Sequence, residues 1–120
     1  MLLIKGINRV IIKKMDKKIF LKEVKDLLVA RFGEDIRDVV LFGSRAAGKE
    51  HKDSDFDVLI VLNSDYDWQY EDKMISVLYE MELEHDIFID SKIISVNELE
   101  NTIKGKEPLY VEAIQEGIHA

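Results

Sequence analysis

The segment DFDVLIVL at positions 55–62 constrains the fold more than any other part of the sequence. Side chains alternate between the two sides of a strand, so Asp55 and Asp57 share one side. The apolar residues on the opposite side are Phe56, Val58, Ile60 and Leu62. The aspartate side continues as leucine and valine at positions 59 and 61. We therefore predict a strand that is buried on both faces, except where two carboxylates begin one of them.

Helical and extended patterns alternate along the chain. Apolar residues recur at spacings of three and four before and after this strand, which is typical of amphipathic helices. The expected elements are helices over 16–32, 68–83, 98–103 and 109–118, and further strands over 37–42 and 87–94. Asp16 is a plausible N-cap for the first helix, and Gly33 lies just past its end. The order α-β-β-α-β-α predicts an α/β domain with a small mixed β-sheet and flanking helices.

Length and composition exclude several classes of protein. A chain of 120 residues suits one domain, which we expect over 16–120, with 1–15 as an N-terminal arm or edge strand. The absence of cysteine excludes disulfides, thiolate metal sites and a cysteine nucleophile. The net charge of -7 argues against nucleic acid as a partner, because phosphate binding needs a basic face. No apolar run approaches the length of a membrane span, so a soluble, cytoplasmic protein is expected.

The loop that follows the first predicted strand carries phosphate-binding features. Gly43 lets the backbone turn and lets a ligand approach closely, and Ser44 offers a hydroxyl and an N–H at the same point. Arg45, Lys49 and Lys52 add positive charge to this loop. A triphosphate needs such donors because its oxygens only accept hydrogen bonds. The alternative is an ordinary connection between two strands with solvated charges.

The aspartate pair points to a divalent cation. At about 6 Å and an effective dielectric of 20, two carboxylates such as Asp55 and Asp57 repel by roughly 3 kcal/mol. A hard cation reverses the sign of that interaction, and carboxylates that hold Mg²⁺ against substrate phosphates are the usual arrangement in phosphoryl transfer. The alternative is that both acids lie at the wet start of the strand, where Asp53 and Ser54 shape a turn.

Taken together, the segment GSRAAGKEHKDSDFDVLIVL resembles the signature of the minimal nucleotidyltransferases of the DNA polymerase β superfamily. The resemblance implies a polymerase β-like fold, a nucleoside triphosphate donor, most simply ATP, and Mg²⁺. Gly43 and Ser44 match the triphosphate-binding pair of that family, and Arg45 matches a position that is often basic. Asp55 and Asp57 match its metal-binding pair.

The same resemblance implies a partner. Many minimal nucleotidyltransferases are encoded beside an all-helical HEPN protein, and several are thought to act as antitoxins that add AMP to it. The expected reaction is transfer of a nucleoside monophosphate, AMP by this likeness, to a hydroxyl on a partner protein. A non-catalytic protein of the same fold that neutralises its partner by contact is the alternative. A small-molecule nucleotidyltransferase is a third possibility, although such enzymes usually carry an extra substrate domain. Leu109, Tyr110 and Ile114 are candidates for an interface.

The family pattern also calls for a third carboxylate, as catalytic base and metal ligand. Asp90 and Asp86 are the candidates, and we choose Asp90, because a lone carboxylate in the middle of a strand is costly without a cation. A parallel third strand would instead favour Asp86, which opens that strand. The remaining candidates are less specific. The histidines His51, His85 and His119 are expected on the surface, and Tyr66, Trp68 and Tyr70 form either a base pocket or a packed corner.

Overall fold

The computed structural model describes residues 17–51 and 54–120. The predicted arm over 1–15, the predicted N-cap Asp16 and the loop residue Lys52 lie outside the described residues. The elements are α2 (Lys17–Phe32), η1 (Gly33–Asp35), β1 (Ile36–Phe42), α3 (Gly43–Ala46), β2 (Phe56–Leu62), α4 (Trp68–His85), β3 (Ile89–Ser95), α5 (Val96–Asn101), η2 (Ile103–Lys106), α6 (Pro108–Glu116) and β4 (Ile118–His119).

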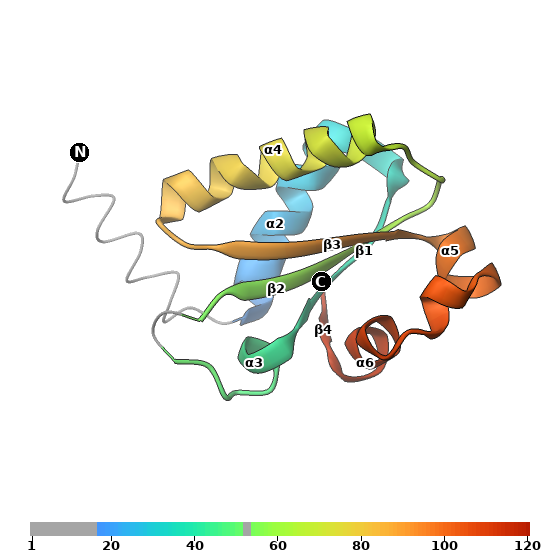
Figure 1. Cartoon of the computed structure of the whole chain (residues 1–120). Coiled ribbons are helices and arrows are strands. Elements are labelled where there is room, and N and C mark those ends of the chain that lie inside the picture. The colour runs from blue at the N-terminus through green and yellow to red at the C-terminus, as the bar shows by residue number, and fades with distance from the viewer. Residues whose placement is uncertain (1–16, 52–53) are drawn as a thin grey trace.

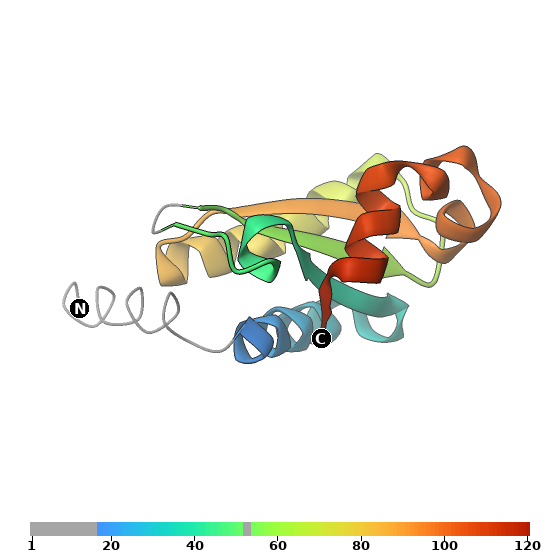
Figure 2. The same ribbon diagram turned by 90° about the horizontal axis from the view of Figure 1, so that it is seen from below.

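The strands form a mixed four-stranded sheet in the order β3-β2-β1-β4 (Figure 1). β1 pairs antiparallel with both β2 and β4. β2 pairs in parallel with β3, and the helix α4 connects these two strands along the chain. The helices α2 and α4 cover one face of the sheet, and α6 lies against the other face, as Figure 2 shows from below. The predicted α/β class, with a small mixed sheet and flanking helices, is confirmed.

The two faces of β2 belong to two separate cores, as the sequence pattern predicts. Phe56, Val58, Ile60 and Leu62 pack with buried residues of α2 and α4. On the opposite face, Leu59 and Val61 pack with Tyr110 and Ala113 of α6. The apolar side chains of this central strand are therefore removed from water on both sides, and burial of apolar surface is the dominant favourable contribution to folding. Tyr110, which we expected at an interface, is buried in this second core.

Of the three aromatic residues near the start of α4, Tyr66 and Tyr70 pack against the core, whereas Trp68 does not. The Tyr66 hydroxyl donates to the carbonyl of Ile93 at 2.9 Å, and the Tyr70 hydroxyl donates to Asp35 at 2.6 Å. Trp68 is 73% exposed. All three residues follow the C-terminal end of β2, whereas the aspartate pair lies at its N-terminal end. These residues therefore lie at the opposite end of β2 from the aspartate pair, which does not fit the alternative that they form a base pocket.

Of the three histidines, His51 and His119 are exposed, but the prediction for His85 is wrong. The His85 side chain is only 12% exposed, at the end of α4, where its Nε2 lies 3.7 Å from Glu23 of α2. None of the helices in the described parts of the chain is long and apolar enough to cross a membrane.

The end of the chain departs from the prediction. The last helix stops at Glu116, and β4 then returns to pair with β1. Gly117 makes this turn possible, because a Cβ at that position would overlap the Ala113 carbonyl and the Val40 side chain. A strand of two residues carries too little periodicity to be read from the sequence.

The side chain of His119 fastens β4 to the sheet. Its Nδ1 lies 2.5 Å from Asp38 and its Nε2 lies 2.9 Å from the Ile114 carbonyl. The bond to Asp38 raises the pKa of His119 above its usual 6.5. A raised pKa means that this contribution to stability is fully present below pH 6.5 and is lost as the pH rises through the higher folded-state pKa.

We expect the melting temperature of the protein to fall over that pH range, and to fall less in His119→Gln, which cannot titrate. Thermal unfolding of both proteins across neutral pH measures the difference. Equal pH profiles would show that the pair of His119 and Asp38 does not stabilise the fold.

Candidate active site

The site is built on a row of three residues from neighbouring strands. Asp57 in β2 is paired with Phe42 at the end of β1 and with Asp90 near the start of β3. Side chains at directly paired positions lie on the same face of a sheet. The row Phe42–Asp57–Asp90 therefore lies on the face that α6 covers further along the strands. Asp55 lies two residues before Asp57, just ahead of the start of β2.

Gly43 brings the loop backbone against the Asp57 carboxylate. Its φ is +72°, a conformation that favours glycine, and a Cβ built at this position would overlap Asp57 Oδ2 and lie 3.0 Å from its Cγ. The glycine is thus required twice, once for the turn and once for the close approach. We expected a ligand to approach Gly43 closely; the group that lies against it in the structure is the Asp57 carboxylate, and the approach of a phosphate stays a prediction.

The segment after Gly43 is not the open loop that we expected. Residues Gly43–Ala46 form one helical turn, α3, continued by hydrogen bonds from the N–H of Ala47 to the Gly43 carbonyl and from the N–H of Lys49 to the Ser44 carbonyl. The sequence GSRAAG has no apolar periodicity over so short a stretch, so the turn could not be predicted. Ser44 is the second residue of this turn and is partly buried.

Arg45 ties the two ends of the loop together. Its Nε and Nη2 both donate to the Ser54 carbonyl, at 3.0 and 2.7 Å, and its guanidinium lies 3.9 Å from the Phe56 ring centroid. The side chain is only 5% exposed, and this burial lowers the pKa of Arg45. These contacts place Arg45 as a support for the backbone that leads into Asp55, and its predicted role as a nucleotide ligand stays a prediction.

Replacement of Arg45 by methionine tests this support. The change leaves the Ser54 carbonyl without its two charged donors, and we expect it to lower the free energy of unfolding by about 1.5–3 kcal/mol. The matched control is Arg31→Met, which removes an exposed ion pair with Glu80 and should change stability little. Chemical denaturation measures both effects, and equal losses would contradict the assigned role.

The environment of Asp57 disfavours its charge. Burial raises the pKa of this carboxyl, and the nearby Asp90 and Asp55 carboxylates raise the pKa further, while Lys92 opposes the shift. A group of like charges on one face of the sheet becomes favourable when a cation joins it. Lys92, missed by the sequence analysis, lies two residues after Asp90 on the same strand, and its Nζ is 3.4 Å from that carboxylate. The period of two along β3 could have identified it.

The structure separates the two candidates for the third carboxylate. Asp90 is the direct neighbour of Asp57, whereas Asp86 is the left-handed C-cap of α4, with φ 54°. Our reasons for choosing between them were wrong, because β3 begins at Ile89 and not at position 87. Asp90 therefore lies near the start of the strand, and its half-exposed side chain is not a buried charge. We expected parallel pairing to favour Asp86, but it places Asp90 beside Asp57.

The carboxylates suit a cation that also binds substrate. Within 17–51 and 54–120, no group of three His, Cys, Asp or Glu side chains is placed so that it could hold a metal ion by itself. Mg²⁺ is usually bound by one or two carboxylates together with substrate phosphates and water. The hard oxygen ligands of Asp55 and Asp57, and the mutual repulsion around Asp57, fit such a shared site.

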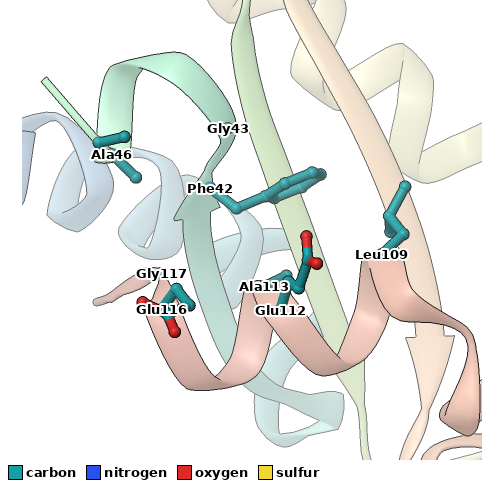
Figure 3. A pocket seen from close by; sticks show the side chains of 9 residues that line it. Phe42, Gly43, Ala46, Leu109, Glu112, Ala113, Glu116 and Gly117 are labelled. Carbon is teal, nitrogen blue, oxygen red and sulfur yellow. The ribbon is translucent and has the colours of Figure 1, made fainter. Parts of the chain in front are cut away.

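A pocket of about 590 Å³ adjoins the row on its β1 side. It lies between α3 and α6, and Figure 3 shows side chains from both helices and from the end of β1 around it. Its apolar lining includes Phe42, Ala46, Leu109 and Ala113, and two carboxylates, Glu112 and Glu116, come from α6. Sequence reasoning missed this pocket, because it depends on how α6 is placed against α3.

The fold and this site define a class of α/β protein in which a glycine-led turn meets a row of carboxylates on a mixed sheet. The chain belongs to the nucleotidyltransferase domain family, whose profile matches residues 17–117. The predicted membership of the nucleotidyltransferases is thereby confirmed.

Comparison with solved structures gives a more distant likeness. A crystal structure of a mutant of the MntA–HpeT toxin–antitoxin pair contains a chain similar to this one, with a TM-score of 0.49 and 15% sequence identity. The match covers 78% of this chain and 83% of that chain. No curated protein matches this chain.

Proposed function

We propose that this protein transfers AMP from ATP to a hydroxyl group on a partner protein. The observation that carries the proposal is the contact of the Gly43 backbone with Asp57, which has a second carboxylate, Asp90, on the next strand. This arrangement puts a turn suited to phosphate beside oxygen ligands suited to Mg²⁺. Membership of the nucleotidyltransferase family supports the same reaction class.

Each residue of the site has a defined part in this reaction. Gly43 and Ser44 bind the β- and γ-phosphates, while Asp55 and Asp57 would hold Mg²⁺ together with the substrate phosphates. Bound Mg²⁺ neutralises phosphate charge and stabilises the attacking and leaving oxygens of an in-line displacement. Asp90 accepts the proton of the attacking hydroxyl. The hydroxyl oxygen bonds to the α-phosphorus, the bond from that phosphorus to the bridging oxygen breaks, and pyrophosphate leaves with both electrons of that bond.

The acceptor is proposed from charge and from the sequence resemblance. A net charge of -7 disfavours tRNA or DNA as the acceptor, because nucleic acid binding is dominated by contacts from basic residues to phosphate. The likeness of the segment 43–62 to minimal nucleotidyltransferases points to an all-helical HEPN protein as the partner. Incubation with α-labelled ATP, Mg²⁺ and the product of the adjacent gene tests this, since label should transfer to that protein.

Neutralisation of a partner by contact alone, the alternative expected from the sequence, gives a different result in the same experiment. Stable complex formation with the partner but no transfer of label would favour this function over the first.

Asp90→Asn separates chemistry from binding. If Asp90 is the base, the substitution should lower the rate of transfer by about 100-fold or more, because general bases contribute factors of that size. Nucleotide affinity should change much less, since the base acts on the acceptor. Asp86→Asn is the matched control, four residues earlier and at the end of α4. Loss of transfer in Asp86→Asn alone would reverse the assignment.

A further inference from the structure

The strand β3 lies at an edge of the sheet, because the order β3-β2-β1-β4 gives it a neighbour on one side only. In Figure 1 it lies in front of β2 and α2, with α4 above it. A strand edge can present unpaired N–H and C=O groups, which another chain can pair with. The same strand carries Asp90, beside Asp57. The hydrogen bonding of this edge therefore decides how an acceptor can approach the site.

The backbone groups of β3 alternate between β2 and the open edge. The N–H of Phe56 donates to the Phe88 carbonyl at 2.9 Å, so the backbone of Phe88 faces β2. In a parallel ladder this direction recurs at every second residue, and Asp90 therefore also bonds to β2. The intervening residues direct their N–H and C=O groups to the open edge. These residues are Ile89, Ser91, Ile93 and Ser95.

Side chains close this edge on both sides of a short open stretch. Glu82 accepts a hydrogen bond from the Ile89 N–H at 2.9 Å, and the Tyr66 hydroxyl donates to the Ile93 carbonyl at 2.9 Å. Between these two contacts, four backbone groups have no hydrogen-bond partner among the residues that the structure describes. They are the Ile89 carbonyl, the N–H and carbonyl of Ser91, and the Ile93 N–H. The open stretch is thus centred on Ser91, the residue that follows the third carboxylate.

We propose that this open stretch binds an extended segment of the acceptor protein as an added strand. The inference rests on the proposed function, because it takes Asp90 to receive the proton of the acceptor hydroxyl. An extended segment that runs in either direction can bond to all four free groups. Its side chain opposite Asp90 then lies on the same face of the sheet as Asp90 and Asp57. A hydroxyl-bearing residue at that position presents its oxygen to the carboxylate.

An exposed aromatic side chain lies next to this position. Phe88 comes two residues before Asp90, and its side chain is 74% exposed. Residues two positions apart share one side of an extended chain, so a docked segment would place a side chain opposite Phe88 two positions from its hydroxyl residue. Contact with an apolar side chain there removes the phenyl ring from water, which favours binding. The expected segment therefore has an apolar residue, one intervening residue and the hydroxyl residue, in either order.

The short length of the open stretch suits a substrate. The contacts at Ile89 and Ile93 leave only four backbone groups free, and each hydrogen bond contributes modestly in water. A contact of that size releases its occupant after transfer. A stable dimer of two copies through β3 would need a larger buried surface.

The experiment measures transfer from α-labelled ATP in Mg²⁺ at increasing concentrations of the product of the adjacent gene. Ser91→Pro removes the outward N–H without removing a bond to β2, and proline is tolerated in edge strands where the N–H faces outward. We expect this variant to raise the KM for the acceptor about tenfold, with ATP affinity unchanged. Ser91→Ala keeps the N–H and should match the unmodified protein. Melting curves verify that each variant is folded.

A second pair of variants tests the side-chain contact and keeps the test decisive if Ser91→Pro does not fold. Phe88→Ser removes the exposed ring beside Asp90 and should also raise the KM for the acceptor. Trp68→Ser is the matched control, because Trp68 is 73% exposed but follows the far end of β2. It should leave this KM unchanged.

Hydrogen exchange followed by NMR reports the docking without any turnover. Addition of the acceptor protein should slow exchange of the Ser91 N–H, because that group gains a hydrogen bond. The Ile89 N–H, which Glu82 already binds, should change little and is the internal control. Slower exchange at Ser91 when this protein alone is concentrated would show that a second copy covers the edge, which would overturn the inference.

The outcomes distinguish this inference from the function on which it rests. Transfer with an unchanged KM in both Ser91→Pro and Phe88→Ser would overturn docking at the edge alone, as would a complex in which exchange at Ser91 is unchanged. Slower exchange at Ser91 in the complex without any transfer would overturn the proposed reaction and support the edge as a binding surface. Absence of both binding and transfer would overturn the proposed function, and the inference with it.

Discussion

Gly43→Ala is expected to lower the affinity for ATP and Mg²⁺ by about 100-fold or more. The added Cβ would overlap Asp57 Oδ2, so either the turn or the carboxylate must move. A hydrogen bond to a charged group is worth about 1.5–3 kcal/mol, so loss of two such contacts to the phosphates and the cation lowers affinity by a factor of that size. The left-handed backbone at this position adds a loss of roughly 1–2 kcal/mol in stability, because side chains disfavour this conformation. Nucleotide titration and chemical denaturation measure the two effects separately.

The chain contains a matched control for this experiment. Gly48 has the same φ of +72°, but a Cβ at that position would meet nothing within 4 Å. Gly48→Ala should therefore show the same backbone strain without the collision. If both variants lose nucleotide affinity equally, the effect comes from strain in the loop and the contact of Gly43 with Asp57 has no function. If neither variant loses affinity, the turn does not bind phosphate.

The double substitution Asp55→Asn with Asp57→Asn should have opposite effects on the protein with and without ligand. Mg²⁺ and ATP at 100 times their dissociation constant should stabilise the unmodified protein by about 2.7 kcal/mol, and the double variant should lose this gain. Without ligand, the variant should be more stable at neutral pH, because it removes carboxylates whose charges repel. Melting temperatures with and without Mg²⁺ and ATP measure both effects.

The pH dependence follows from the raised pKa of Asp57. The folded carboxyl holds its proton at a pH where the unfolded one, near 3.8, releases it. Its stabilising contribution is therefore present below pH 3.8 and is lost as the pH rises through the folded-state pKa. The double variant should lack this loss. Asp72→Asn with Glu84→Gln removes the same charge from exposed positions on α4 and is the control. If Mg²⁺ and ATP raised the melting temperature of the aspartate double variant as much as that of the unmodified protein, the metal assignment would be contradicted.

The sequence predicted the parts of the fold that depend on long periodic patterns. The alternation along β2 placed its two faces correctly, and apolar spacing located α2 and α4 within two residues of their ends. The short turn α3 and the two-residue strand β4 were missed, because neither has a period that a pattern can display. Tyr110 was misplaced for a related reason, since its burial depends on how α6 lies against the sheet.

The candidate site was predictable in its residue types and less so in its geometry. Glycine after a strand and aspartates two residues apart are local signals, and the structure brings Gly43 and Asp57 into contact. The placement of Asp90 depends on strand register, which no local pattern states. The role of Arg45 as a support depends on Ser54, which lies across a loop. The pocket needs two helices that are far apart in the sequence.

The pairing of β2 with β3 has a consequence for how this domain tolerates insertions and deletions. Side chains on a strand reverse their direction with each residue, so a slip of one position would turn Asp90 toward the face covered by α2 and α4. The register is set by the burial of Ile93 in one core and Ile94 in the other, and the short connection from the left-handed Asp86 to Ile89 must have the length that fits it. A change in the length of that connection would therefore disturb the site as much as replacement of an aspartate, although none of the residues in the connection belongs to the row Phe42–Asp57–Asp90. Variation in length is tolerated far better at loops that do not set a register, since lengthening a surface loop costs little entropy.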